Sequence, residues 1–337
     1  MIELTVSEDA AGQRLDKYVR RALRDVPLSH VYKMFRTKKI RVNGLRGKPE
    51  QILAGGDKIA IRGDEERLLV PAGAASGTSG GGRASRRTFG ILHEDEHLLV
   101  VDKPAGLAAH PGSGIEGATL VDEVRTYLRV PDDLPPGEFK PSPAHRLDRD
   151  TSGVVLVAKT RKAMVRLGEL FTEGDEVRKA YLALAKGKFA KSAGTIDLPL
   201  SEHEQTSRSK DRRGVNFQEA LTRWQVVSAN HDASLLRVAI ETGRTHQIRR
   251  HLQAVGHPVA GDRRHGDFPF NREAKARWGL KRMFLHAFRL EVPHPVTDAP
   301  LRFEAPLPPE LVLVLGRANL EPPPGAAKPG APAPKRN

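Results

Sequence analysis

Residues 145–153 read HRLDRDTSG and lead directly into the apolar run VVLVA at residues 154–158. The run has the length and the β-branched content of a buried strand. The nine residues before it contain five ionisable side chains and two hydroxyl groups, a composition that is rare in a protein core. A solvated loop with internal salt bridges is the ordinary explanation, and a reactive site at the start of a strand is the alternative.

The segments around this loop predict the fold class. Residues 98–101, 181–185, 235–240 and 288–292 have the apolar character of strands, and residues 119–130 have helical spacing. Strands and helices do not alternate regularly along this part of the chain. We therefore expect an α+β domain rather than the βα repeats of a parallel sheet.

A second dense motif, TGRTHQIRRHL, occupies residues 242–252. Its two histidines, His246 and His251, stand five positions apart, about 140° around a helix, whereas zinc-binding pairs on a helix stand four apart on one face. A metal site is therefore not expected. The three arginines of the motif are suited to pair with a carboxylate or with phosphates.

Composition excludes several classes of protein. The 337 residues contain no cysteine, so the chain has no disulfide, no thiolate nucleophile and no cysteine-based metal site. No apolar run approaches the roughly 20 residues that span a bilayer, and the N-terminus lacks the features of a secretory signal. We expect a cytoplasmic protein that does not bind a membrane. The net charge of +14 favours a polyanionic partner.

The N-terminal sixty residues predict two short helices followed by a small sheet. Apolar residues at positions 15, 19, 22 and 23 lie on one helix face, and Ser29 is expected to cap a second helix after the break at Pro27. Residues 40–42 and 58–61 alternate like strands, and Asn43-Gly44 is a strong two-residue turn signal.

Most of the positive charge lies in this region. Residues 14–48 hold twelve Lys or Arg and two acids, a net charge of +10 that leaves +4 for the rest of the chain. Such density favours the phosphate backbone of a nucleic acid as partner over simple solvation of helix faces. The basic residues expected to contact RNA are Arg20, Arg21, Lys33, Arg36, Lys38, Lys39 and Arg41.

The N-terminal region resembles an S4 domain, the small RNA-binding fold of ribosomal proteins and several RNA-modifying enzymes. The resemblance covers about residues 13–62 and is carried by RLDK, PLS, IRVNG and GDKI in that order. The predicted organisation is an S4-like domain, a flexible Gly/Ser/Ala linker, the α+β domain and a disordered Pro/Ala-rich tail, at residues 1–70, 71–88, 89–316 and 317–337.

The two dense motifs are similar to the signature motifs of the RluA family of pseudouridine synthases. Further matches are DKPAG at 102–106, RKAY at 178–181, GHP at 256–258 and FLHA at 284–287. With an S4-like domain in front, the chain is most similar to the RluC type of this family. The resemblance implies a mixed, mainly antiparallel sheet and the isomerisation of uridine to pseudouridine in large-subunit (23S) ribosomal RNA.

The resemblance also assigns roles to single residues. Asp148 is the essential carboxylate and Arg244 its ion-pair partner; Arg146 holds the RNA with the target uridine flipped out, and Tyr181 packs against the extruded base. The reaction gains and loses no atom, so no cofactor or metal is implied. The implied partner is ribosomal RNA, free or in assembling particles, and the enzyme is expected to be a monomer.

One departure and several alternatives stay open. Relatives commonly carry Tyr in the motif that reads GDRRHG at residues 261–266 of this chain, which leaves the local RNA contacts undefined. A non-catalytic ribosome-assembly factor or a synthase acting on tRNA would share the RNA-binding features. The GSGIEG match at residues 112–117 does not leave directly from a strand, so a dinucleotide-binding oxidoreductase is disfavoured.

Overall fold

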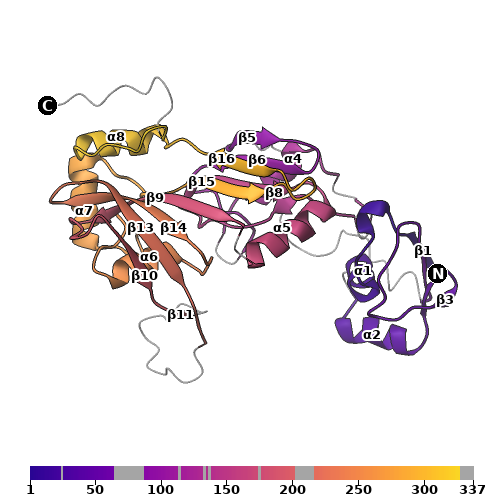
Figure 1. The fold of residues 1–337 in the computed structure, drawn as a ribbon. Coiled ribbons are helices and arrows are strands. Elements are labelled where there is room, and N and C mark those ends of the chain that lie inside the picture. The colour runs from indigo at the N-terminus through magenta and orange to yellow at the C-terminus, as the bar shows by residue number, and fades with distance from the viewer. Residues whose placement is uncertain are drawn as a thin grey trace. The chain divides into compact units, whose positions relative to one another are not determined.

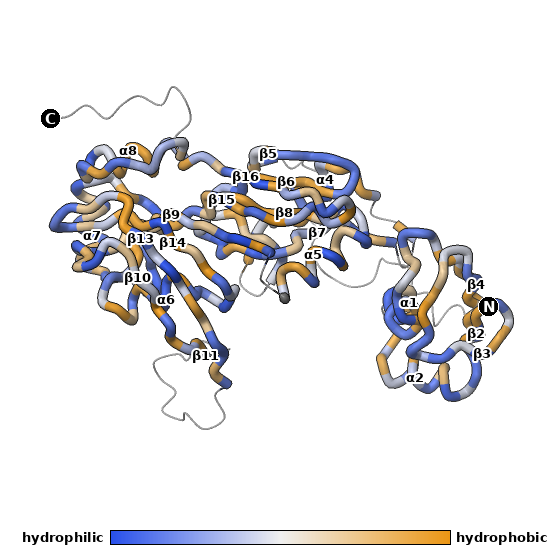
Figure 2. The backbone as a smooth tube through the Cα atoms, in the orientation of Figure 1, coloured by the Kyte–Doolittle hydropathy of each residue, from blue (hydrophilic) through white to orange (hydrophobic). Residues whose placement is uncertain are grey.

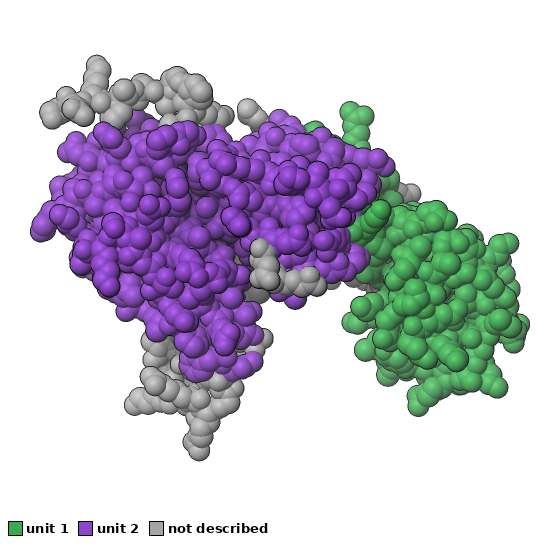
Figure 3. All heavy atoms as spheres, viewed as in Figure 1, with its two compact units in different colours: residues 1–86, 124–141, 160–162 green, residues 87–123, 142–159, 163–337 purple. Residues whose placement is uncertain are grey.

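The computed structural model describes residues 1–23, 26–63, 87–112, 115–131, 134–135, 138–173, 176–201 and 216–326. It divides into two units, one made of residues 1–86, 124–141 and 160–162 and the other of residues 87–123, 142–159 and 163–337 (Figure 3). The predicted linker lies outside the described residues except at its end, residues 87–88. No helix of the described part is both long and apolar enough to cross a bilayer.

The first unit contains the predicted pair of helices and a four-stranded antiparallel sheet in the order β1-β4-β2-β3. Its elements are β1 Ile2–Thr5, the 3-10 turn Glu8–Ala10, α1 Leu15–Ala22, α2 Leu28–Arg36, β2 Ile40–Val42, β3 Leu45–Arg46 and β4 Lys58–Ile61. The predicted cap at Ser29 is wrong. Pro27, with φ −55° and ψ 141°, occupies the N-cap position, so α2 already begins at Leu28.

The Asn43-Gly44 signal forms the predicted turn between β2 and β3, with φ of 49° and 80° at its two residues. Both values lie in the left-handed region that asparagine and glycine tolerate best. The apolar faces of α1, α2 and the sheet bury a common core around Leu15, Val19 and Ile59. This amphipathic pattern leaves the basic residues on the outside of the unit.

The second unit is built on a ten-stranded sheet (Figure 1). The strands run in the order β10-β13-β14-β9-β15-β8-β6-β5, with β16 beside β15 and β7 beside β8. Their bounds are β5 Gly90–Glu94, β6 Leu98–Lys103, β7 Ser142–Pro143, β8 Ser152–Ala158, β9 Arg178–Lys186, β10 Ala193–Asp197, β13 Leu221–Ala229, β14 Ala233–Ile240, β15 Leu285–Pro293 and β16 Pro300–Glu304. A separate pair joins β11 Leu200–Ser201 to β12 Phe217–Gln218.

Pairing in the large sheet is antiparallel except between β8 and β15, among the strands that the structure describes. The expected α+β class with a mainly antiparallel sheet is therefore confirmed. Five helices accompany the described strands: α4 Leu120–Tyr127, α5 Arg161–Glu173, α6 Gln247–Ala254, α7 Phe268–Trp278 and α8 Pro309–Arg317. The neighbouring strands β6 and β8 are almost wholly buried and carry hydrophobic colour in Figure 2.

The C-terminal end of the described chain packs further than the sequence predicted. Ala318, Leu320 and Ala326 are buried in the core cluster that joins α7 and α8 to the sheet. The backbone N–H of Leu307 also donates to the carbonyl of Ala326 at 2.6 Å. The predicted start of a disordered tail at residue 317 is therefore too early, and residues 327–337 lie outside the described part.

Candidate active site

The loop that carries Asp148 connects β7 to β8 and is fixed at both of its ends. Gly153, the second residue of β8, has φ 118°, and a Cβ there would lie 2.2 Å from the carbonyl oxygen of Ala287 on β15. Only glycine allows β8 and β15 to approach in parallel at this point. The sequence TSG therefore sets where the loop meets the sheet.

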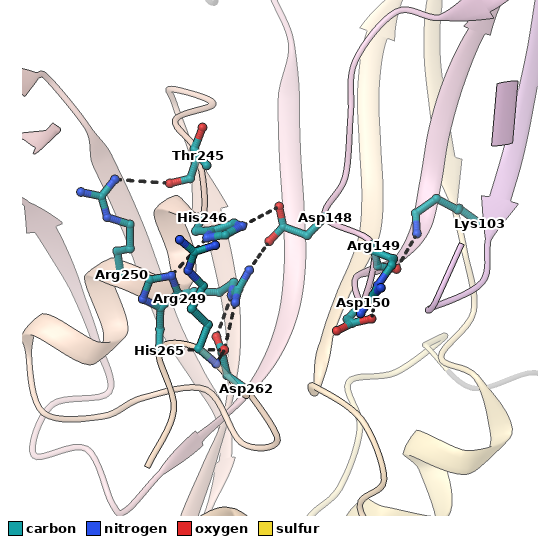
Figure 4. A network of polar contacts seen from close by, with 11 residues as sticks. Lys103, Asp148, Arg149, Asp150, Thr245, His246, Arg249, Arg250, Asp262 and His265 are labelled. Carbon is teal, nitrogen blue, oxygen red and sulfur yellow. Dashed lines mark hydrogen bonds and ion pairs between the residues drawn. The ribbon is translucent and has the colours of Figure 1, made fainter. Parts of the chain in front are cut away.

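A buried ammonium group holds the middle of the same loop. Lys103, at the end of β6, is fully buried, and its Nζ donates to the carbonyls of Pro104, Leu107 and Arg149 at 3.0, 2.8 and 3.1 Å. Figure 4 shows its side chain reaching the backbone beside Asp150. Burial lowers the pKa of Lys103 to about 7, although nearby carboxylates oppose the change. Lys103 thus anchors the residue next to Asp148.

His145 fastens the beginning of the loop. Its Nε2 accepts the backbone N–H of Leu156 at 3.0 Å, and its ring lies 4.9 Å from that of Phe171, centroid to centroid. Burial, with a smaller contribution from the charge of Lys179, lowers the pKa of His145 to about 3. The neutral form is therefore held in place as a hydrogen-bond acceptor, and this histidine of the HRLD motif positions the loop.

Asp148 forms an ion pair with Arg249 of α6. Arg249 NH1 donates to Asp148 Oδ2 at 2.9 Å, while its Nε and NH2 donate to Asp262 at 2.6 and 2.9 Å (Figure 4). Burial alone would raise the pKa of Asp262, but these bonds and the backbone N–H groups of Arg264 and His265 lower it. The pKa of Arg249 is raised, because its two carboxylate partners outweigh its burial.

The prediction that Arg244 pairs with Asp148 is wrong. Arg244 lies before the first turn of α6, is exposed, and its Nε donates to the carbonyl of Glu219 at 3.1 Å. Arg249 lies inside the helix, where Ile248 and Leu252 are also buried, so its side chain faces Asp148. A buried arginine requires a paired charge, but the motif alone does not show which of its arginines is buried.

A cavity of about 550 Å³ opens above Asp148. Arg146 and Arg244 line it as exposed cations, and Tyr181 on β9 lines it as a nearly buried ring. Burial and the charge of Asp148 both raise the pKa of Tyr181, so its phenol stays protonated at neutral pH. The four residues predicted for the site thus line one cavity, and among them Asp148 is the one that pairs with Arg249.

Of two histidines that sequence reasoning did not assign, His246 lies beside the carboxylate and His265 lies beside His246. The Nε2 of His246 lies 3.7 Å from Asp148 Oδ1, and its Nδ1 lies 3.1 Å from Nε2 of His265. His246 is the N-cap residue of α6 in the left-handed region, with φ 54°. The described residues contain no group of three or more acidic, histidine or cysteine side chains placed to hold a metal ion.

The chain is similar to proteins of known name. Residues 97–254 match the family model for RNA pseudouridylate synthase. Ribosomal large subunit pseudouridine synthase C of Pasteurella multocida is 40% identical over 314 residues, covering 93% of this chain and 92% of that protein. The protein of the same name from Escherichia coli K12 is 37% identical over 316 residues, covering 90% and 92%. The solved structure of Human RNA Pseudouridylate Synthase Domain Containing 4 superposes with a TM-score of 0.56 at 29% identity, covering 69% of this chain and 94% of that one.

Proposed function

Since this chain belongs to the RNA pseudouridylate synthase family, we propose that it isomerises uridines to pseudouridines in large-subunit ribosomal RNA, with Asp148 as the reacting carboxylate. The relatives named for the large ribosomal subunit share more than nine-tenths of their length with it. The observation that carries the assignment is the geometry of Asp148. One carboxylate oxygen is held by Arg249, and the group borders a cavity of about 550 Å³.

The ionised form of Asp148 is what the reaction requires. Uracil must leave C1′ of its ribose through N1 and return through C5, and a carboxylate beside the sugar acts in this exchange as nucleophile or base. The guanidinium of Arg249 donates to Oδ2 of Asp148 from 2.9 Å and so places a positive charge beside this carboxylate. Arg249 in turn keeps its own place through the bidentate bond to Asp262.

The cavity is suited to a single extruded nucleotide. Its volume lies in the range of small-molecule pockets, and the ring of Tyr181 offers a surface for the base. Stacking on an aromatic ring contributes about 1–3 kcal/mol, which offsets much of the few kcal/mol needed to unstack a nucleotide. Arg146 also lines the cavity and its guanidinium is exposed. It would bind a phosphate of the RNA, or fill the gap that the extruded uridine leaves in the base stack.

The N-terminal unit supplies a second contact with RNA. Its predicted RNA-binding side chains are exposed except Arg41, which is half-buried and donates to the carbonyl of Gly44 at 3.2 Å. Exposed cations bind phosphates by releasing counterions, so they provide affinity without base specificity. The exposure of these cations supports the proposal that this unit holds structured ribosomal RNA as an S4 domain would.

The decisive experiment maps pseudouridines in ribosomal RNA from cells that lack this gene and carry a rescuing copy. The wild-type copy is expected to restore the lost sites, and Asp148→Asn is expected to restore none, because the amide has the same shape without the charge. Asp150→Asn is the matched control, since Asp150 pairs with the exposed Arg149 at 3.4 Å. Restoration by Asp148→Asn would make the protein a non-catalytic RNA-binding factor, and losses confined to tRNA would change the substrate.

A further inference from the structure

We propose that a second cavity beside Asp148 binds the base of a nucleotide that adjoins the target uridine in the RNA chain. This cavity, which we call the neighbour cavity, has a volume of about 590 Å³, close to the 550 Å³ of the cavity that holds the uridine in the proposed function. The inference rests on that proposed function and adds a subsite that helps to select the sequence around the uridine.

The two cavities meet at the reacting carboxylate. Five residues line both of them: Arg146, Leu147, Asp148, His246 and Arg249. One phosphodiester joins a uridine to the next nucleotide, so a uracil bound beside Asp148 brings the adjoining base to the edge of the first cavity. Sequence-specific recognition of RNA commonly uses bases that have left the stack. The neighbour cavity therefore lies within reach of the same strand.

An apolar segment of the neighbour cavity is suited to the flat face of a base. Ala108, Ala109 and Pro111, which follow β6, line the cavity together with Met283. The carbonyl of Ala108 accepts the backbone N–H of Leu120, the first residue of α4, at 2.8 Å, so this segment is fixed to the rest of the unit. Extruded bases are held by packing between apolar or aromatic side chains. Two successive alanines leave the space that such a base needs.

A basic turn between α6 and α7 lines the same cavity. Arg263 is exposed on this turn. Asp262 fixes the turn, because its Oδ1 accepts the backbone N–H of Arg264 at 2.8 Å. The guanidinium of Arg249 binds both Asp262 and Asp148 (Figure 4). The backbone of Arg263 is therefore held at a fixed position relative to the reacting carboxylate.

The charges of the neighbour cavity leave two cations for the RNA strand. Five arginines and three aspartates line it, and each aspartate accepts a hydrogen bond from an arginine of the same cavity. Arg146 and Arg263 have no ion-pair partner among the residues that the structure describes. Guanidinium groups bind phosphates strongly and fix the register of a nucleic-acid strand. These two arginines would bind the phosphates on the two sides of the adjoining nucleotide.

The test uses the full-length protein and large-subunit ribosomal RNA assembled by ligation around a synthetic segment with one mapped target uridine. Three RNAs are compared: the natural sequence, one with an abasic ribose on the 5′ side of the uridine, and one with an abasic ribose on its 3′ side. The rate of single-turnover pseudouridine formation, and its dependence on enzyme concentration, are measured for wild type, Ala109→Leu and Arg263→Gln.

The matched controls carry the same changes outside both cavities. Ala239→Leu on β14 and Arg178→Gln on β9 alter exposed residues that line neither cavity. Both are expected to behave as wild type on all three RNAs. Thermal unfolding shows whether each variant is folded.

Ala109→Leu is expected to slow pseudouridine formation about 30-fold on the natural RNA, because the larger side chain occupies the space of the adjoining base. On one of the two abasic RNAs wild type is expected to slow about tenfold, and Ala109→Leu to match it within about twofold, because no base then enters the cavity. Structural damage at Ala109 would instead slow the variant equally on the three RNAs. That result, or no slowing on the natural RNA, would overturn the proposal.

Arg263→Gln tests the same cavity from its surface, and decides the matter if Ala109→Leu does not fold. It is expected to weaken binding of every RNA and to lower the slope of log affinity against log salt by about 0.7, the share of one phosphate on a single strand. A slope equal to that of Arg178→Gln would overturn the proposal. Wild-type protein that leaves the uridine of the natural RNA unmodified would overturn the proposed function itself.

Discussion

Basic side chains in the two units lie in opposite environments. In the first unit Arg36, Lys38 and Lys39 are exposed around the end of α2, whereas in the second unit Arg249 and Lys103 are buried and contact the loop that carries Asp148. The buried cations have fixed partners, two carboxylates for Arg249 and three carbonyls for Lys103. Exposed cations are free to pair with a polyanion that arrives from solution.

This difference separates two uses of positive charge. A buried cation holds particular acceptor groups in place, and its removal leaves those buried acceptors without a hydrogen-bond partner. An exposed cation contributes through long-range attraction, which salt screens, and its removal changes little in the fold. Under the proposed function, the net charge of +14 favours RNA binding, while the site depends on a few cations that hardly alter that total.

The largest effect is expected from Arg249→Met. Removing this guanidinium leaves Asp262 buried without its bidentate partner and Asp148 without its ion pair, a change that costs about 3–5 kcal/mol of unfolding free energy. Urea unfolding measures this loss, and single-turnover assays are expected to show activity near background. Arg244→Met is the matched control for stability, because the Arg244 side chain is exposed and donates to the backbone carbonyl of Glu219 at 3.1 Å. Equal stabilities of the two variants would remove the contrast between buried and exposed arginines.

The substitution Lys103→Met tests the buried ammonium group through the pH dependence of the unfolding free energy. The pKa of Lys103 falls from 10.5 when unfolded to about 7 when folded, so the unfolded chain binds more protons between these values. Stability from this residue must then rise as pH increases through that window, and must be at its lowest below about pH 7. Between pH 7 and 9 we expect the unfolding free energy of wild type to increase by about 1–2 kcal/mol relative to Lys103→Met.

Urea unfolding at a series of pH values measures that difference. The matched control is Lys188→Met, which removes an exposed lysine of the same unit and is expected to leave the pH dependence of wild type unchanged. Parallel stability curves for wild type and Lys103→Met would show that the three carbonyls hold the ammonium charged throughout the window.

The sequence predicted the elements of this fold well because their patterns are local. The apolar run at residues 154–158 became the buried strand β8, and Asn43-Gly44 formed the turn that its conformational preference requires. The position of the last packed residues was missed, because the burial of Leu320 and Ala326 depends on contacts with distant strands and helices. The apolar residues of this proline-rich segment do not repeat with the spacing of a helix or a strand, so the sequence alone does not reveal those contacts.

The site was predicted only in part for a related reason. Asp148, Arg146, Tyr181 and Arg244 do line one cavity, but the choice of Arg249 as the ion-pair partner depends on where α6 begins. A helix boundary that shifts by a few residues changes which arginine faces the loop. The contact between His246 and His265 joins residues 19 positions apart and had no signal in either motif alone.

The smallest effect is expected at the end of α2, where Lys38 has φ 59°. This residue follows the C-cap Thr37, and its N–H donates to the carbonyl of Phe35 at 3.2 Å, while that of Lys39 donates to Met34 at 3.0 Å. Glycine is the preferred residue after a helix C-cap, because a side chain in this left-handed conformation costs about 1–2 kcal/mol. A lysine here is unfavourable for the helix end and places a charge on the outer surface.

Lys38→Gly should therefore separate stability from RNA binding. We expect the unfolding free energy to rise by about 0.5–1 kcal/mol, since glycine adopts this conformation without strain. The slope of log affinity against log salt should fall by about 0.7–0.9, the share of one phosphate contact. Lys39→Gln, which removes a charge from a residue without positive φ, is expected to lower the salt slope equally and leave stability within about 0.5 kcal/mol. A salt slope that Lys38→Gly leaves unchanged would place Lys38 outside the RNA contact, and lower stability would show that its backbone conformation is not strained.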